Sequence, residues 1–283
     1  MRDESKITDS PMPASLSTKV FRRNAPLREN LHCVRAAGFT HLHFAHMWKA
    51  RDYVTRENEE EWMHALADCG MQVLDAHGCH PKDVDLDSDV AENREAAVAQ
   101  LIHRIQLTHR LGGDAVVYHV PTRRVAEPRH IHYLLEGVKK VEDTARELGI
   151  CIAMENHYIP ENDKSALETV FEAFDADFIG FTFDPGHALI SGNTDWILRT
   201  CGSRLRILHL NDNDGKGDRH WLPFDPEGKA DWPRIMRFIA ESPYDKPLQL
   251  EINLNLDRYG DHDTYLAKAY QTVQTLADMM QSA

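Results

Sequence analysis

The chain has 283 residues, 42% of them hydrophobic, so it is long enough to bury a sizeable core. Its formal net charge of −13 at pH 7 argues against general binding to a nucleic-acid backbone or to anionic lipid, although it allows a local basic site. Length alone fits one barrel of about 250 residues as well as two domains of about 140 residues.

The cysteines and the first residues bear on compartment. The five cysteines (33, 69, 79, 151 and 201) are scattered, odd in number and without a C-x-x-C pair, which predicts a reducing, cytoplasmic location. The polar N-terminus has no apolar signal-peptide core, and we expect residues 1–14 to form a flexible arm before a single domain over 15–283. No segment approaches the roughly 18 consecutive apolar residues of a membrane span, so no membrane partner is expected.

Apolar runs alternate with helical periodicity through the first half of the chain. A weak strand over 14–20 is followed by the helical spacing of Leu27, Leu31 and Val34, which stops at Gly38. The pattern then predicts a strand over 41–46, a helix over 57–69, a strand over 71–76 that runs into His77, a helix over 92–111, a strand over 114–118 that runs into His119, and a helix over 132–148.

The second half repeats this alternation. It predicts a strand ending at Glu155, a helix over 166–174, a strand over 178–183 ending at Asp184, a short helix over 195–200, a strand from 205 ending at His209, a helix over 232–239, a strand ending at Glu251 and a last helix over 263–280.

Eight strand-and-helix units without a Pro-rich or Gly/Ser linker favour an α/β chain folded as a single (β/α)8 TIM barrel over an open doubly wound sheet. No G-x-G-x-x-G follows a strand, which counts against a dinucleotide-binding fold. The segment over 211–230 is longer than ordinary connections between a strand and a helix, and we expect it to be functional.

The ends of four consecutive strands carry metal-ligand side chains: Glu155, Asp184, His209 and Glu251. In a (β/α)8 barrel, the carboxyl ends of all strands meet at one mouth, so these four would converge there. Three carboxylates at close quarters raise one another's pKa, and a divalent cation removes that repulsion. The oxygen-rich set with one imidazole suits one ion, with Mn²⁺ favoured and Mg²⁺, Co²⁺ or Zn²⁺ as alternatives. Singly, each residue would be an ordinary loop charge, helix cap or hydrogen-bonded histidine.

Other polar residues follow the strands, each with a functional and an ordinary interpretation. His187 would contact substrate or a second metal, or be a loop histidine. Asp218, Arg219 and His220 would bind substrate or extra metal, or form a solvated loop. His77 and His119 would be ligands or pocket walls, and Trp48 would line the pocket or pack as an ordinary aromatic residue. Arg123, Arg124 and Arg129 fit an exposed charge run better than an anion site.

The runs Glu155-Asn156-His157, FDPGH (183–187), LHLND (208–212) and LEIN (250–253) resemble the xylose isomerase-like barrel superfamily of sugar (phosphate) isomerases and epimerases. The resemblance extends over nearly the whole chain from about residue 15. It implies a metal held by residues 155, 184, 209 and 251, the two glutamates as an acid/base pair, and His187 on substrate oxygens. The same superfamily includes endonuclease IV, a three-zinc phosphodiesterase, whose extra ligands would correspond to His77, His119, His187, Asp218 and His220.

The leading hypothesis is therefore a metal-dependent sugar or polyol isomerase/epimerase that transfers protons through an enediolate, with Glu155 and Glu251 as the acid/base pair and Arg219 as a further substrate contact. A dehydratase with the same metal site, an endonuclease IV-like phosphodiesterase and a sugar-binding protein without turnover remain as alternatives. A small-molecule substrate is expected, nucleic acid is not, and a homo-oligomer is compatible with the sequence.

Overall fold

The computed structural model describes residues 12–45, 58–78 and 84–283. Within this part, eight parallel strands form one sheet in the order β7-β6-β5-β4-β3-β2-β1-β8. The strands are β1 (Ala14–Ser17), β2 (His41–Phe44), β3 (Gln72–His77), β4 (Ala115–His119), β5 (Cys151–Glu155), β6 (Ile179–Phe183), β7 (Leu205–Leu208) and β8 (Leu248–Leu250).

The two edge strands of the sheet approach each other just beyond β7. The backbone N–H of Leu210 donates to the carbonyl of Gln249, and the N–H of Glu251 donates to the carbonyl of Leu210, both at 3.1 Å. The sheet therefore forms a nearly closed barrel, and the predicted single (β/α)8 barrel is confirmed.

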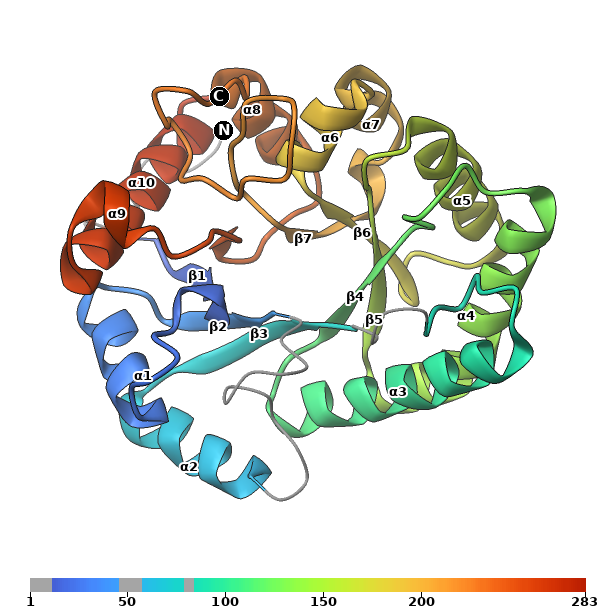
Figure 1. Ribbon diagram of the computed structural model, residues 1–283, viewed down its shortest axis with the longest axis horizontal. Coiled ribbons are helices and arrows are strands. Elements are labelled where there is room, and N and C mark those ends of the chain that lie inside the picture. The colour runs from blue at the N-terminus through green and yellow to red at the C-terminus, as the bar shows by residue number, and fades with distance from the viewer. Residues whose placement is uncertain (1–11, 46–57, 79–83) are drawn as a thin grey trace, which may run out of the picture.

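Helices surround the strands as an outer ring (Figure 1). They are α1 (Leu27–Ala36), α2 (Glu59–Cys69), α3 (Ala91–Arg110), α4 (Pro128–Leu148), α5 (Pro160–Ala173), α6 (Pro185–Ser191), α7 (Thr194–Thr200), α8 (Trp232–Glu241), α9 (Leu256–Tyr259) and α10 (His262–Gln281), with 3-10 turns η1 (Thr18–Val20) and η2 (Gly202–Arg204).

Burial explains why the strands are apolar runs while the helices are amphipathic. Every residue of β5 and of β6 is buried, because a barrel strand faces the interior on one side and the helices on the other. On α4, the apolar side chains at helical spacing face inward, including Leu134, Val138 and Val141, while Gly149 ends the helix at φ 64°.

The barrel interior is not apolar throughout. Ser15, His43, Asp75 and Gln249 are all 0% exposed, and they come from β1, β2, β3 and β8. The Ser15 hydroxyl donates to Gln249 Oε1 at 3.1 Å, and His43 Nδ1 is hydrogen-bonded to Asp75 Oδ1. A buried polar layer therefore lies among the strands that build the mouth, and within the described residues His43 Nε2 and Asp75 Oδ2 have no hydrogen-bond partner.

Several predicted element boundaries differ from the structure. The first strand ends at Ser17 and continues as η1, α4 begins at Pro128 rather than at residue 132, and α5 begins at Pro160 rather than at residue 166. Proline at the first helical position explains both early starts, since its missing N–H costs nothing there. Helix α6, which was not predicted, begins in the same way at Pro185.

Among the described residues, no helix is both long enough and apolar enough to cross a membrane. The four described cysteines, at 33, 69, 151 and 201, are all free thiols.

Candidate metal centre

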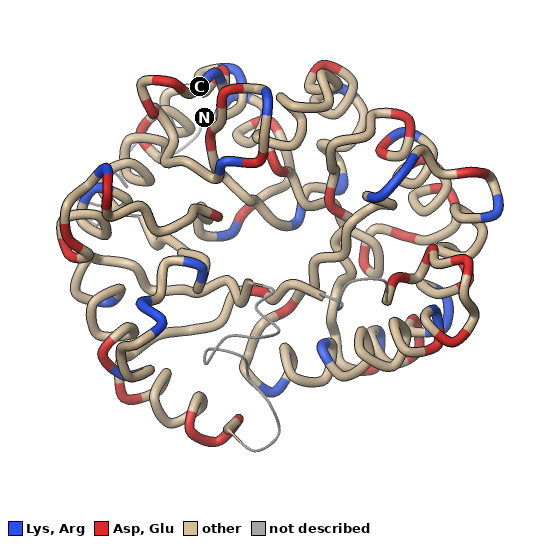
Figure 2. The backbone as a smooth tube through the Cα atoms, in the orientation of Figure 1, with Lys and Arg blue, Asp and Glu red and all other residues tan. Residues whose placement is uncertain are grey.

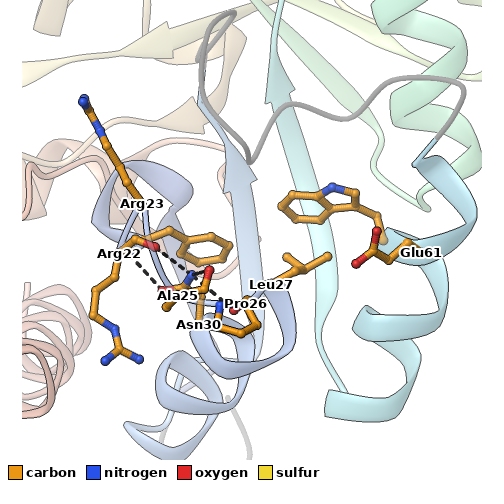
Figure 3. Close-up of a pocket in the computed structure, with 9 residues that line it drawn as sticks. Arg22, Arg23, Ala25, Pro26, Leu27, Asn30 and Glu61 are labelled. Atoms are coloured by element: carbon orange, nitrogen blue, oxygen red, sulfur yellow. Dashed lines mark hydrogen bonds between the residues drawn. The ribbon is translucent and has the colours of Figure 1, made fainter.

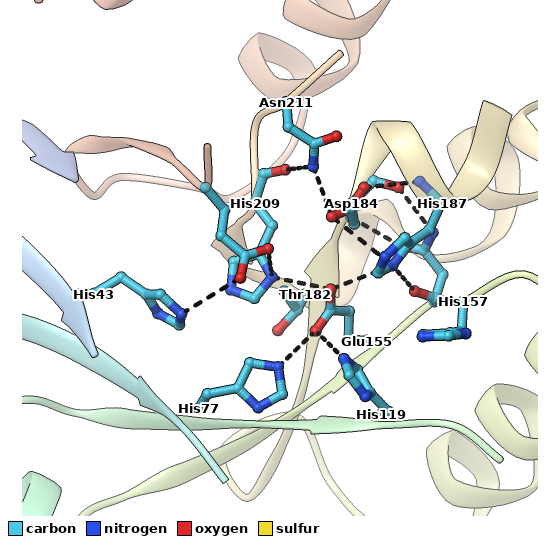
Figure 4. Close-up of polar contacts among 12 residues, drawn as sticks. His43, His77, His119, Glu155, His157, Thr182, Asp184, His187, His209 and Asn211 are labelled. Atoms are coloured by element: carbon cyan, nitrogen blue, oxygen red, sulfur yellow. Dashed lines mark hydrogen bonds and ion pairs between the residues drawn. The ribbon is translucent and has the colours of Figure 1, made fainter. Parts of the chain in front are cut away.

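The structure brings the four predicted ligands together at one end of the barrel. Glu155 ends β5, Asp184 follows β6, His209 follows β7 and Glu251 follows β8. One possible ligand atom from each lies within 4.8 Å of those of the other three, and all four residues are buried. Figure 4 shows Glu155, Asp184 and His209 directed toward one another from neighbouring strands.

The start of helix α6 fixes the position of Asp184. The Asp184 side chain caps the helix by accepting from the His187 backbone N–H at 2.8 Å, and its other oxygen accepts from Asn211 Nδ2 at 2.8 Å. The Asn156 side chain accepts from the Asp184 N–H at 3.0 Å and donates to the Asp184 carbonyl at 2.8 Å. The carboxylate is therefore held on the backbone and on the side chain before any ligand binds.

Histidine nitrogens surround the Glu155 carboxylate on several sides. His209 Nδ1 lies 2.9 Å away, His119 Nε2 3.2 Å, and both His77 Nε2 and His187 Nδ1 3.4 Å. Burial acts to raise the pKa of Glu155, but the charges of His209 and His119 and their hydrogen bonds hold this pKa well below its ordinary value. Glu155 is therefore a carboxylate available to a cation.

Glu251 has a partner that sequence analysis missed. Lys19 Nζ, on η1, lies 2.8 Å from Glu251 Oε1 and 3.3 Å from His220 Nε2. Burial opposes ionisation of Glu251, yet the charges of His209, Lys19 and His220 keep its pKa well below the ordinary value. Only 12% of the Lys19 side chain is exposed, so the ammonium belongs to the site and not to the surface.

Imidazoles, together with the Lys19 ammonium, balance the negative charge of the centre in this structure. Burial lowers the pKa of His209, but the Glu155 and Glu251 charges outweigh it and raise the pKa to about 9. The same competition raises the pKa of His187 to about 10, with Asp184 as the main opposing charge. The pKa of Asp184 is raised, because burial outweighs the attraction of His187.

A second group of possible ligands adjoins the first: His187, Asp218 and His220. His187 Nδ1 donates to the Asn156 carbonyl at 2.9 Å, and His220 Nδ1 donates to the Glu251 carbonyl at 2.8 Å. The Nε2 atoms of both histidines therefore face the Asp218 carboxylate, at 3.6 and 3.0 Å. A ring whose other nitrogen is held by a carbonyl is oriented as metal-binding histidines are.

A third group on the other side of Glu155 contains His77 and His119. Their rings are 4.7 Å apart, and both Nε2 atoms face Glu155 Oε2. Both predicted strand-end histidines therefore point inward, and Glu155 is common to this group and to the four-residue group.

The remaining predicted site residues are less central. Arg219 is exposed and lies 3.4 Å from Asp214, while Trp48 lies outside the described residues. The three arginines after β4 form ion pairs with acidic neighbours: Arg123 with Asp85, Arg124 with Asp89, and Arg129 with Asp89 and Glu127.

Two aromatic residues after β5 complete the wall of the mouth. The His157 ring lies 4.8 Å from His119 and 4.6 Å from His187, and the Tyr158 hydroxyl donates to Asp218 at 2.7 Å. Burial and neighbouring imidazolium charges lower the pKa of His157, so this ring is neutral. Its place directly after Glu155-Asn156 was the only sequence signal for it.

The donor set fits a divalent metal ion. Three buried carboxylates and one imidazole offer hard oxygen ligands with a nitrogen, the combination that Mn²⁺, Mg²⁺ or Zn²⁺ accepts. His187 Nε2 is buried without a hydrogen-bond partner among the described residues, which fits a ligand position at the adjoining group.

The fold and this mouth define a (β/α)8 barrel whose strand ends carry an acidic and histidine-rich centre. The chain belongs to the xylose isomerase-like TIM barrel family, whose model matches residues 31–269.

A relative with 29% identity is the uncharacterized protein y4fM of Sinorhizobium fredii (strain NBRC 101917 / NGR234), with 91% of this chain and 90% of that protein covered. A D-tagatose 3-epimerase-like protein of known structure has a TM-score of 0.77 at 18% identity, covering 96% of this chain and 99% of that one. Such low identity establishes the fold alone.

Two further similar structures contain metal ions. The IOLI protein with a bound zinc atom has a TM-score of 0.73 at 14% identity, covering 96% of this chain and 99% of that one. A Mycobacterium smegmatis barrel protein in complex with magnesium has a TM-score of 0.68 at 18% identity, covering 95% of this chain and 98% of that one.

Proposed function

We propose that the protein is a divalent-metal-dependent isomerase or epimerase of a sugar or polyol. The observation that carries this proposal is the arrangement of Glu155 and Glu251 around His209. Their carboxylates lie 2.9 and 3.2 Å from His209 Nδ1, and they come from β5 and from the end of β8, with β6 and β7 between these strands. The lowered pKa values keep both carboxylates ionised, and their places on two sides of one centre suit removal of a proton on one face of a substrate carbon and its return on the other.

Each residue has a defined part in this chemistry. Glu155, Asp184, His209 and Glu251 would hold the ion, and its Lewis acidity would polarise a substrate carbonyl and acidify the adjacent carbon. One glutamate takes the proton from that carbon and the other returns it, with an enediolate between the two steps. His187, which is buried beside the centre, would orient substrate hydroxyls, and the His157 ring packs against it at 4.6 Å.

Glu251→Gln tests the proposal because it keeps the shape of the side chain and removes the base. Panels of ketoses, aldoses and cyclic polyols in deuterated water would be followed for deuterium incorporation at carbon. We expect the wild type with Mn²⁺ to exchange a carbon-bound proton. The variant should remain folded, with a melting temperature lowered by the loss of the Lys19 ion pair, and should lose exchange. Wild-type exchange in the folded variant would refute the acid/base assignment.

The same enediolate can expel a β-hydroxyl, so a dehydratase is the nearest variant of this mechanism. The exchange experiment separates the two, since a dehydratase forms a product lighter by one water. A sugar-binding protein without turnover would give no substrate-dependent exchange at all.

A second candidate is a phosphodiesterase with three metal ions. Three ligand groups adjoin one another, and Glu155 belongs to two of them, which is how a multi-metal centre is built. Against nucleic acid as the substrate, the net charge is −13, and lysines and arginines are scattered among acidic residues around the ring (Figure 2).

Metal content of the purified protein, measured by mass spectrometry, distinguishes the two candidates. Three zinc ions per chain together with hydrolysis of a model phosphodiester would favour the phosphodiesterase. One ion per chain with proton exchange would favour the isomerase.

A further inference from the structure

A separate group of metal-type side chains lies on the outside of the barrel, between its first and last helices. It consists of Cys33 on α1, with His262 and Asp263 in the first turn of α10. One possible ligand atom from each lies within 4.8 Å of the others. The group joins the helix after β1 to the helix after β8, where the two ends of the barrel sequence meet.

The His262 ring is oriented as a ligand. Its Nε2 donates to the Val20 carbonyl at 3.1 Å, which leaves the lone pair on Nδ1. Nδ1 has no hydrogen-bond partner among the described residues, and it is shielded from solvent, because His262 is only 5% exposed. A buried nitrogen acceptor without a donor is costly unless something binds it, and a ring held by a carbonyl is the usual support of a metal ligand.

The surroundings allow a cation to enter and to be balanced. A surface groove of about 420 Å³, lined by Cys33 and Asp263 among others, opens onto the group. The Arg22 guanidinium lies 3.7 Å from Cys33 Sγ, but it also pairs with Glu29 at 2.7 Å, so its charge is offset. Arg22 also lines a separate pocket beside α1, which Figure 3 shows together with Arg23 and Asn30.

We propose that Cys33, His262 and Asp263 bind one zinc-class ion that clamps α1 to α10. Thiolate, imidazole and carboxylate are the ligand types that Zn²⁺ prefers, and the groove leaves a fourth position for water. Ligand atoms around a tetrahedral ion lie roughly 3.5 Å apart, and rotation of the exposed Asp263 side chain closes the remaining gap. On binding, the Cys33 thiol releases its proton to solvent.

Sulfur-to-metal charge-transfer absorption tests this site without interference from the barrel mouth, whose described ligands are oxygen and nitrogen atoms. Adding Co²⁺ or Cd²⁺ to the full-length protein should produce this absorption band. Its intensity should correspond to one metal-bound thiolate per chain. We expect Cys33→Ser to lose it and Asp263→Asn, which changes an exposed side chain, to weaken the affinity by at least about tenfold.

Cys79→Ser is the matched control, because residue 79 lies outside the described part of the chain and is the other cysteine close to a histidine in sequence. It should retain the absorption. The proposal is overturned if wild-type protein shows no absorption with excess metal, if Cys33→Ser retains it, or if Cys79→Ser abolishes it.

Discussion

Replacing Lys19 by methionine removes a buried ammonium group and leaves the Glu251 carboxylate short of a partner. The Nζ–Oε1 distance of 2.8 Å and the burial of both side chains make this a buried ion pair. Removing one member of such a pair costs about 3–5 kcal/mol in the free energy of unfolding. For 283 residues the unfolding entropy is roughly 0.6 kcal/mol per degree, so the melting temperature should fall by about 5–8 °C.

A divalent ion at Glu251 would supply the charge that Lys19 provides. We therefore expect the difference in melting temperature between Lys19→Met and wild type to be largest in EDTA and to narrow after addition of Mn²⁺ or Zn²⁺. Differential scanning calorimetry with and without metal measures both values. Lys216→Met, which alters an exposed lysine in the segment over 211–230, is the control. It should leave the melting temperature unchanged both in EDTA and in metal.

Two results would refute this reasoning. A melting temperature of Lys19→Met in EDTA within about 1 °C of wild type would show that the ion pair contributes nothing to stability. An equal difference in EDTA and in metal would show that no ion binds at Glu251.

Three further predictions concern the same region. In EDTA, the stability that protonated His187 and His209 contribute should be complete below about pH 6.5. It should be lost as pH rises through their raised pKa values of about 10 and about 9. Thermal melts across this pH range measure the loss. Asp184→Asn should keep the cap of α6, since asparagine caps as well as aspartate, yet lower metal affinity at least tenfold by calorimetric titration. Asp212→Asn, which replaces a buried acceptor of several N–H groups, should cost about 2–3 kcal/mol in chemical denaturation.

The sequence predicted the barrel and the meeting of four strand ends because each signal is local. An apolar run of strand length followed by a ligand-type side chain is visible in Glu155, Asp184, His209 and Glu251, and the barrel topology then brings them together. Their roles as ligands and as acid/base groups stay predictions.

Other features were missed because they depend on tertiary contacts or on a misjudged residue. Lys19 lies within the weak strand predicted over 14–20, and nothing nearby indicates that its ammonium reaches Glu251. His43 alternates with apolar residues in β2, yet its partner Asp75 lies on another strand. Helix α6, which spans only seven residues, was not predicted, although Asp184 followed by Pro185 is a typical helix start.

The double use of Asp184, as helix cap and as centre residue, restricts where the chain can change length. Phe183 ends β6 and Pro185 begins α6, so one inserted residue there would displace the carboxylate from Asn211 and from the His187 N–H together. The segment after Asp212 is different, because that side chain also accepts from the backbone N–H groups of Lys229 and Ala230. Insertions between these anchors would leave the strand ends in place, so new specificities are best engineered by varying that loop.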